Sequence, residues 1–228
     1  MAVSMADIKA LRQRTGAGIL DCKKALAEND GNVDAAIDWL RAKGTVKAAK
    51  KAGRAATEGL VYSYIHDGGR IGVLVEVNCE TDFVAMNDKF NDFVDDIAMH
   101  IAASAPEFVS KDDVDDEAIA HERKVQLARI EEEGTKPAKM PQERWNMILE
   151  NKINGRMRKW YEEVCLLEQP FIKDDKKTVG QVVADTVSTI GENIKVRRFV
   201  RFVLGEGLEK KKDNLAEEVA KMAAEAQA

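Results

Sequence analysis

The feature that most constrains the fold is a change of hydrophobic period. Up to residue 44 apolar residues recur every three or four positions, whereas residues 59–66 and 71–79 are rich in Val, Ile, Leu and Tyr and have an alternating pattern. Between these segments, Asp67-Gly68-Gly69 supplies residues that tolerate the positive φ angles of a tight turn. The pattern predicts an antiparallel β-hairpin that follows a helical segment.

Residues 1–44 predict a compact module of three short helices. Gly16 and Gly18 favour a turn over a helix interior, and the Asn-Asp-Gly-Asn run at 29–32 ends the second helix. The third helix shows the i, i+3, i+4, i+7 spacing of one buried face in Val33, Ala36, Ile37 and Leu40. Gly44 stands where a C-terminal cap is expected.

Helices are also predicted after the hairpin. Asn87 is a suitable cap for a helix that ends before Pro106 and should lie against the hairpin. Residues 112–133 are strongly charged with a thin apolar stripe, which predicts a partly exposed helix. Two more helices are predicted, one with Pro141 in its first turn and one over residues 178–187.

A second alternating segment predicts a strand that joins the hairpin. Its apolar residues occupy every second position among Ile194, Val196, Val200, Phe202 and Leu204. The predicted fold class is therefore α+β, with an N-terminal three-helix module, an antiparallel three-stranded sheet covered by helices, and a C-terminal helix. We expect a helical module (1–44), a basic linker (45–56), an α+β core (57–204) and a helical tail (205–228).

Composition bears on location and on redox state. The longest stretches without a charged residue, such as residues 97–106, are about half of the roughly 20 apolar residues that a membrane-spanning helix requires. The N-terminus lacks the apolar run of a signal peptide, so we expect a cytoplasmic protein with no membrane contact. Cys22, Cys79 and Cys165 are odd in number and far apart, which predicts reduced, half-buried thiols.

A basic segment leaves two interpretations open. Between Arg41 and Arg54 there are six basic residues and no acidic one, although the chain has a net charge of -5. Such a run is typical of an arm that binds nucleic acid or the ribosome, and more often of a solvated helical linker. No aromatic residue is interleaved to stack on bases, and the acidic remainder would repel phosphates. We therefore expect no nucleic-acid partner.

The chain also lacks the common catalytic motifs. It has no phosphate-binding loop, dinucleotide fingerprint, zinc-protease motif, nucleophile elbow or paired-cysteine motif. The three histidines lack metal-ligand spacing, and His100 falls at the margin of an apolar helix stripe, where it is either a core-edge residue or a partner contact. We expect a binding protein rather than an enzyme, with no cofactor and no metal. An uncharacterised enzyme is the alternative class.

Three segments resemble signatures of the elongation factor Ts family, in the family's order. They are residues 14–26 (RTGAGILDCKKAL), 76–85 (EVNCETDFVA) and the stretch from 194–198 (IKVRR) through 202–209. The resemblance implies an N-terminal module like ubiquitin-associated domains, followed by a dimerisation-type core. It further implies that the protein binds elongation factor Tu and releases its GDP by disturbing the magnesium and phosphate site, without binding nucleotide itself.

The resemblance also implies which residues act. By position, the residues that intrude beside the magnesium site would be Thr81, Asp82, Phe83 and Val84. Phe83 would be an apolar wedge, and Asp82 would repel phosphate, bond a partner group or merely cap the turn. Read alone, Phe83 is equally consistent with core packing. In the N-terminal module the next candidates are Arg14, Ile19 and Leu20.

The chain departs from longer members of that family. Those members carry two related core halves and a coiled-coil insertion, whereas here the hairpin and the 81–85 segment lead directly into residues 96–103 and 107–109, which resemble the second half. We expect a short form with a single core copy. A homodimer that supplies two cores is therefore a hypothesis.

Overall fold

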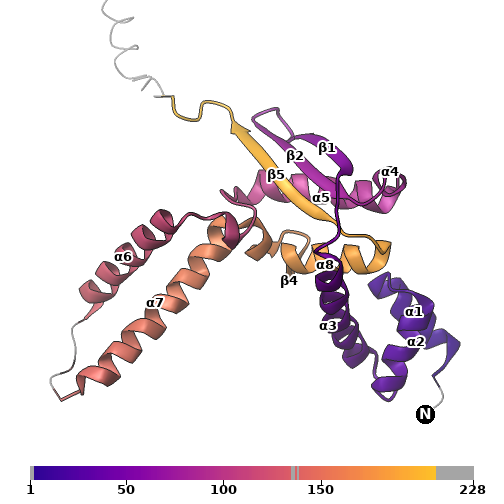
Figure 1. The fold of residues 1–228 in the computed structure, drawn as a ribbon, viewed down its shortest axis with the longest axis horizontal. Helices are drawn as coiled ribbons and strands as arrows, with labels where there is room; N and C mark the ends of the chain where they lie inside the picture. The colour runs from indigo at the N-terminus through magenta and orange to yellow at the C-terminus, as the bar shows by residue number, and fades with distance from the viewer. Residues whose placement is uncertain (1–2, 135–136, 138, 209–228) are drawn as a thin grey trace, which may run out of the picture.

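The structure is a computed structural model that describes residues 3–134, 137 and 139–208. Figure 1 shows a cluster of N-terminal helices, a central sheet with helices packed on it, and a pair of long helices that projects from this centre. The predicted C-terminal helix, within residues 209–228, lies outside the described residues. No helix in the described part of the chain combines the length and hydropathy that a membrane span requires.

The N-terminal module consists of α1 (Met5–Thr15), α2 (Ile19–Glu28) and α3 (Val33–Lys51), as predicted. The side chains of Ser4 and Asn32 accept hydrogen bonds from backbone N–H groups and so cap α1 and α3. The three helices enclose a small apolar core of Ile8, Leu11, Cys22, Ala25, Leu26 and Ala36. The sequence pattern therefore located both the helices and their buried faces.

Helix α3 does not end at Gly44, as the sequence predicted, but continues to Lys51. Gly44 is buried, and a Cβ atom at this position would lie 3.7 Å from the Cβ of Ser188 in α8 (Val179–Ile190). Gly44 is therefore a residue of the helix interior at the contact with α8, where a Cβ atom would make only an ordinary contact, and it is not a cap. The basic linker predicted at 45–56 is thus helical as far as Lys51.

The central sheet is antiparallel with the strand order β1-β2-β5, where β1 is Glu58–Ile65, β2 is Ile71–Cys79 and β5 is Lys195–Val203. The predicted hairpin is confirmed, and Gly68 and Gly69 in its turn have φ angles of 80° and 66°. Helix α5 (Asp88–Ser104) packs on one face of this sheet, beside α8 (Figure 1). The buried residues of α5 include Phe90, Phe93, Val94, Ile97, Ala98 and Ile101.

Strand β5 changes faces along its length because it contains a β-bulge. Its pairing with β2 skips Arg197. A strict two-residue alternation would place Val196 and Phe202 on one face, but Val196 is 8% exposed and Phe202 is 69% exposed. The predicted strand is confirmed, whereas the uniform alternation is wrong beyond the bulge. The outer face of the sheet consequently exposes Val61, Ile65, Leu74, Val200 and Phe202.

Helices α6 (Asp116–Glu133) and α7 (Gln142–Val164) lie side by side and project from the core (Figure 1). A small cluster of Ile130, Ile153 and Met157 joins them. The partly exposed helix predicted for this region is confirmed. The predicted passage from the hairpin through residues 81–85 into residues 96–103 and 107–109 is direct in the structure, and this helical hairpin is inserted after it, between α5 and α8.

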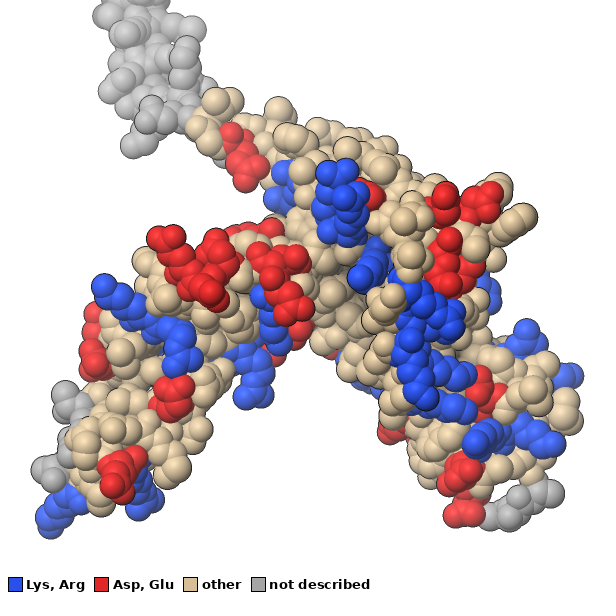
Figure 2. Space-filling model, in the orientation of Figure 1, with Lys and Arg blue, Asp and Glu red and all other residues tan. Residues whose placement is uncertain are grey.

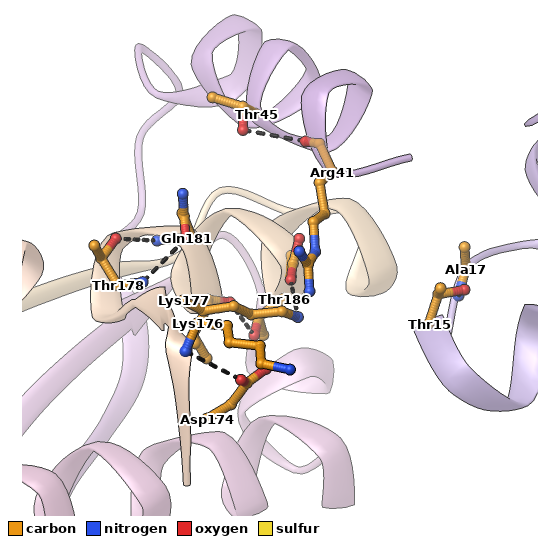
Figure 3. A network of polar contacts seen from close by, with 12 residues as sticks. Thr15, Ala17, Arg41, Thr45, Asp174, Lys176, Lys177, Thr178, Gln181 and Thr186 are labelled. Atoms are coloured by element: carbon orange, nitrogen blue, oxygen red, sulfur yellow. Dashed lines mark hydrogen bonds and ion pairs between the residues drawn. The ribbon is translucent and has the colours of Figure 1, made fainter. Parts of the chain in front are cut away.

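Two short strands and one short helix were not predicted. Strands β3 (Pro170–Phe171) and β4 (Asp174–Thr178) form a small antiparallel ribbon that leads into α8. Thr178 and Gln181 form a capping box at the start of α8, which confirms the helix predicted there (Figure 3). A single turn of helix, α4 (Asp82–Ala85), follows β2.

Candidate partner-binding site

The segment after β2 presents an aromatic ring to solvent. Here Phe83 is 79% exposed and Met86 is 69% exposed, while Val84 and Ala85 pack against the core. This excludes the alternative in which Phe83 is a core residue of the isolated chain. It also makes Val84 an anchor for the segment. We call residues 81–86 the tip.

Within the tip, the capping role left open for Asp82 belongs to Thr81. The Thr81 hydroxyl oxygen accepts a hydrogen bond of 3.4 Å from the backbone N–H of Val84 and so caps α4. The exposed Asp82 carboxylate accepts a bond of 2.9 Å from the backbone N–H of Phe83. Asp82 therefore places a negative charge beside the backbone of Phe83.

A loop far away in the sequence holds the tip in place. The half-buried carboxylate of Glu192, between α8 and β5, accepts hydrogen bonds from the backbone N–H groups of Glu80 (3.1 Å) and Thr81 (3.0 Å) and from the Thr81 hydroxyl (2.7 Å). Glu192 lies 111 residues from Thr81. Sequence reasoning missed Glu192 because no periodic pattern or motif relates segments so far apart.

The candidate residues of the N-terminal module lie on a second surface. Leu20 is 83% exposed and Ile19 is 49% exposed at the start of α2. The guanidinium of Arg14, at the end of α1, forms an exposed ion pair of 3.2 Å with Asp34. The structure thus places these side chains at the surface, but on α1 and α2 rather than beside α4 (Figure 1).

For His100 the structure favours the core position over the partner contact. The ring is fully buried, Nε2 lies 2.9 Å from the side-chain oxygen of Gln169, and Nδ1 accepts a bond of 3.3 Å from the Ile172 N–H. Burial lowers the pKa of His100 below its ordinary value. A direct partner contact would require displacement of both neighbours.

The three cysteines are free thiols, as predicted, but they are fully buried rather than half-buried. Burial raises the pKa of Cys165 to about 11 and also raises the pKa of Cys22 and Cys79. The Cys79 thiol donates a hydrogen bond of 3.1 Å to the carbonyl of Thr81. These thiols therefore serve packing and, at Cys79, the geometry of the tip.

Several side chains of the basic segment are paired within the chain. Lys43 and Lys47 donate hydrogen bonds of 3.1 and 2.7 Å to Asp21, and the Lys47 ammonium is the main cause of the lowered pKa of that carboxyl. Arg54 lies 3.4 Å from Glu80. Figure 2 nevertheless shows Lys and Arg gathered over α3 and again over β5.

A polar cavity of about 190 Å³ lies between the N-terminal module and α8, and several of its charges are also paired. Lys177 donates a hydrogen bond of 2.7 Å to Asp185, near the Arg41 side chain (Figure 3). Among the described residues, no three side chains of His, Cys, Asp or Glu come together as a metal site would require. The exposed features that stand out are therefore the tip, the start of α2 and the apolar outer face of the sheet.

A three-helix module joined to an α+β core, with an apolar tip offered to solvent, is an arrangement suited to contact with another macromolecule. Comparison with known sequences assigns the chain to the translation elongation factors. The chain belongs to the elongation factor Ts family, because a sequence model of that family, described as "Elongation factor TS", matches residues 32–206.

Relatives named elongation factor Ts match nearly the whole chain. The relative from Geobacter sulfurreducens is 55% identical over 220 residues, which cover 96% of this chain and 98% of the relative. Those from Desulforamulus reducens and Alkaliphilus oremlandii are 56% and 52% identical, over 96% and 99% of this chain and 96% and 100% of the relatives. Membership of the family, predicted from three motifs, is confirmed.

Proposed function

We propose that this chain is a guanine-nucleotide exchange factor for elongation factor Tu. It binds the GTPase, inserts the tip beside its magnesium and phosphate site, and promotes release of GDP without binding nucleotide or performing chemistry of its own. The observation that carries the proposal is the exposure of Phe83 and Met86, 79% and 69%, on a single anchored turn. Paired apolar side chains held toward solvent are typical of interface anchors.

Asp82 and Phe83, the two exposed side chains of α4, have different roles in this proposal. The ring of Phe83 enters between elements of the partner and stabilises a displaced packing. The adjacent Asp82 brings negative charge toward the diphosphate, and the loss of magnesium removes the cation that holds that diphosphate in place. Thr81 and Val84 contribute by fixing the turn from which both side chains project.

Phe83 cannot supply the required free energy alone. Changing a two-state equilibrium from 1:99 to 99:1 needs about 5.5 kcal/mol of differential binding, whereas burying one Phe contributes roughly 1.5 to 3 kcal/mol. The remainder comes from other contacts, for which Arg14, Ile19 and Leu20 are the exposed candidates. Coupling is reciprocal, so nucleotide that rebinds to the GTPase also expels the factor.

The test is release of labelled GDP from elongation factor Tu, with and without this protein, at several protein concentrations. We expect the unmodified protein to accelerate release and Phe83→Ala to lose most of that acceleration. Met147→Ala is the matched control, because Met147 is also exposed (60%) but lies on α7. Absence of acceleration by the unmodified protein contradicts the function. Full activity of Phe83→Ala contradicts the site.

A separate variant tests the N-terminal surface. Leu20→Ala removes exposed apolar area on α2 without touching the tip. If this surface supplies binding energy, the concentration of factor that gives half-maximal release rises, while the rate at saturation stays near that of the unmodified protein. An unchanged half-maximal concentration contradicts the assignment of this surface.

We also propose that two copies of the chain associate through the outer face of the sheet. This face exposes apolar side chains from all three strands, including Val61 (66%), Leu74 (45%) and Phe202 (69%), and no described helix covers it. Contiguous apolar surface of this kind is unfavourable in water unless a partner buries it. A second copy supplies a matching apolar face and would bring two cores together.

Light scattering at micromolar concentration tests this association. We expect a dimer for the unmodified protein and a monomer for Phe202→Lys, since a charge within an apolar contact is costly to bury. Met147→Lys, which places the same charge on an exposed apolar position of α7, should remain a dimer. A monomeric unmodified protein, both alone and with elongation factor Tu, rules out the proposal.

A further inference from the structure

We infer that Glu192 is a positioning residue for nucleotide exchange, and that its loop ties the orientation of the tip to the end of the N-terminal module. The inference rests on the proposed function and assigns a role to residues outside the motif that carries the tip. The hydrogen bonds that support this role are made by residues 192 and 193, in the loop between α8 and β5.

All polar atoms of Thr81 form hydrogen bonds. Glu192 accepts from the Thr81 N–H and hydroxyl, at 3.0 and 2.7 Å, and the Cys79 thiol donates to the Thr81 carbonyl at 3.1 Å. Hydrogen bonds to an ionised carboxylate are stronger than hydrogen bonds between neutral groups. Since α4 begins at the next residue, these contacts fix the direction in which the helical turn leaves the sheet.

Helix α4 is very short. Four residues are far too few to hold a helix by themselves, because forming the first turn fixes several dihedral angles for one hydrogen bond. The orientation of Phe83 therefore depends on the anchors at either end of the turn. Glu192 supplies the anchor at the start, and Val84 and Ala85 pack against the core.

The same loop also contacts the segment that follows the N-terminal module. The backbone N–H of Asn193 donates a bond of 2.6 Å to the Glu80 carboxylate, and the Asn193 side-chain amide donates one of 2.8 Å to the carbonyl of Arg54. Asn193 is only 3% exposed, and Arg54 lies three residues after the end of α3. One loop thus contacts both the tip and the segment that leads from the helical module into the sheet.

The physical consequence is preorganisation. A wedge that pivots freely loses conformational entropy in the step that disturbs the magnesium site, whereas a wedge fixed in advance does not. Glu192 bonds Thr81, so its effect on exchange passes through Thr81 to Phe83 and requires no contact with the partner. A positioning residue of this kind changes the rate of release at saturation more than the strength of binding.

The experiment compares Glu192→Gln with Glu131→Gln, which alters an exposed carboxylate on α6. Glutamine keeps the size of Glu192, but its NH₂ group cannot accept the bonds that one carboxylate oxygen accepts. At saturating factor we expect labelled GDP release from elongation factor Tu to be about tenfold slower with Glu192→Gln. The half-maximal concentration and the melting temperature should stay near those of the Glu131→Gln control.

A double-mutant cycle separates positioning from a general loss of structure. If Glu192 acts through the tip, Glu192→Gln has little further effect in a Phe83→Ala background. Thr81→Val, which removes the hydroxyl bond to Glu192 together with the cap on α4, should reproduce part of the loss if Glu192→Gln proves unstable. Additive effects in the cycle, or full activity of both Glu192→Gln and Thr81→Val beside an active unmodified protein, overturn this inference alone. An inactive unmodified protein overturns the proposed function and this inference together.

Discussion

Gly59 of β1 lies so close to Val77 of β2 that a Cβ atom on Gly59 would come within 2.1 Å of the Val77 carbonyl oxygen. The φ angle of Gly59 is 131°, a conformation that side chains rarely adopt. We therefore predict that Gly59→Ala destabilises the protein by roughly 3 kcal/mol or more, through overpacking and backbone strain. Urea denaturation followed by circular dichroism measures the change.

Gly155 supplies the matched control for that substitution. It lies inside α7, and a Cβ atom there would meet no atom within 4 Å. Gly155→Ala should therefore stabilise the protein by up to about 1 kcal/mol, because alanine is the better helix former. Equal stability of Gly59→Ala and the unmodified protein would show that the β1 and β2 backbones are not packed this closely.

We predict that stability falls with pH on the acid side of neutrality partly because of His100. Burial keeps its pKa below the ordinary value of about 6.5. Between these two values the unfolded chain binds a proton that the folded protein excludes. Stability therefore decreases as pH falls through this window, by up to about 1.4 kcal/mol per pH unit, and stops changing below the folded pKa.

The measurement for His100 is the free energy of unfolding in urea at several pH values between about 8 and 5. The slope against pH should be smaller for His100→Gln than for the unmodified protein. His121→Gln, which changes an exposed histidine on α6, is the control for the substitution itself. Identical slopes in all three proteins would exclude this role for His100.

The three thiols should be protected from a thiol-specific dye until the protein unfolds. Cys22, Cys79 and Cys165 are fully buried, and the thiolate is the reactive form. The pKa of Cys165, raised to about 11, alone lowers its thiolate fraction at neutral pH about a hundredfold. Dye uptake should be slow in buffer and rapid, with all three thiols reacting, in concentrated urea. Rapid labelling in buffer would contradict the burial.

The basic segment should not retain RNA at about 0.15 M salt. Lys43 and Lys47 share Asp21, and Arg54 lies beside Glu80, so part of the positive charge is already neutralised. An electrophoretic mobility assay with labelled RNA at increasing salt measures this directly. A retarded band that disappears only as salt is raised would favour the nucleic-acid alternative instead.

Local patterns predicted the elements whose causes are local. The turn at Gly68 and Gly69, the cap at Asn87 and the buried stripe of α5 each depend on residues within a few positions of one another. The exposure of Phe83 was not predictable in this way, since an apolar residue after a strand is equally consistent with a core position. Only the surrounding family motifs favoured the tip.

The errors have causes that act across the chain. Gly44 is a helix-ending residue by its own propensity, but α8 packs against it and the helix continues. The bulge at Arg197 reverses the faces of β5, and with it both Arg197 and Arg198 reach Glu76 on the neighbouring strand, at 2.7 Å each. Both the continuation of α3 and the bulge in β5 involve tertiary contacts, which cannot be predicted from the pattern of a single segment.

The strand order β1-β2-β5 has a consequence for how the chain is made. Strand β2 gains its second neighbour, and Thr81 gains Glu192, only after more than a hundred further residues have been added. On the ribosome the N-terminal helices can fold early, because their contacts are local, whereas the tip cannot be fixed until β5 has emerged. A nascent chain interrupted before residue 192 would therefore carry Phe83 on an unanchored turn.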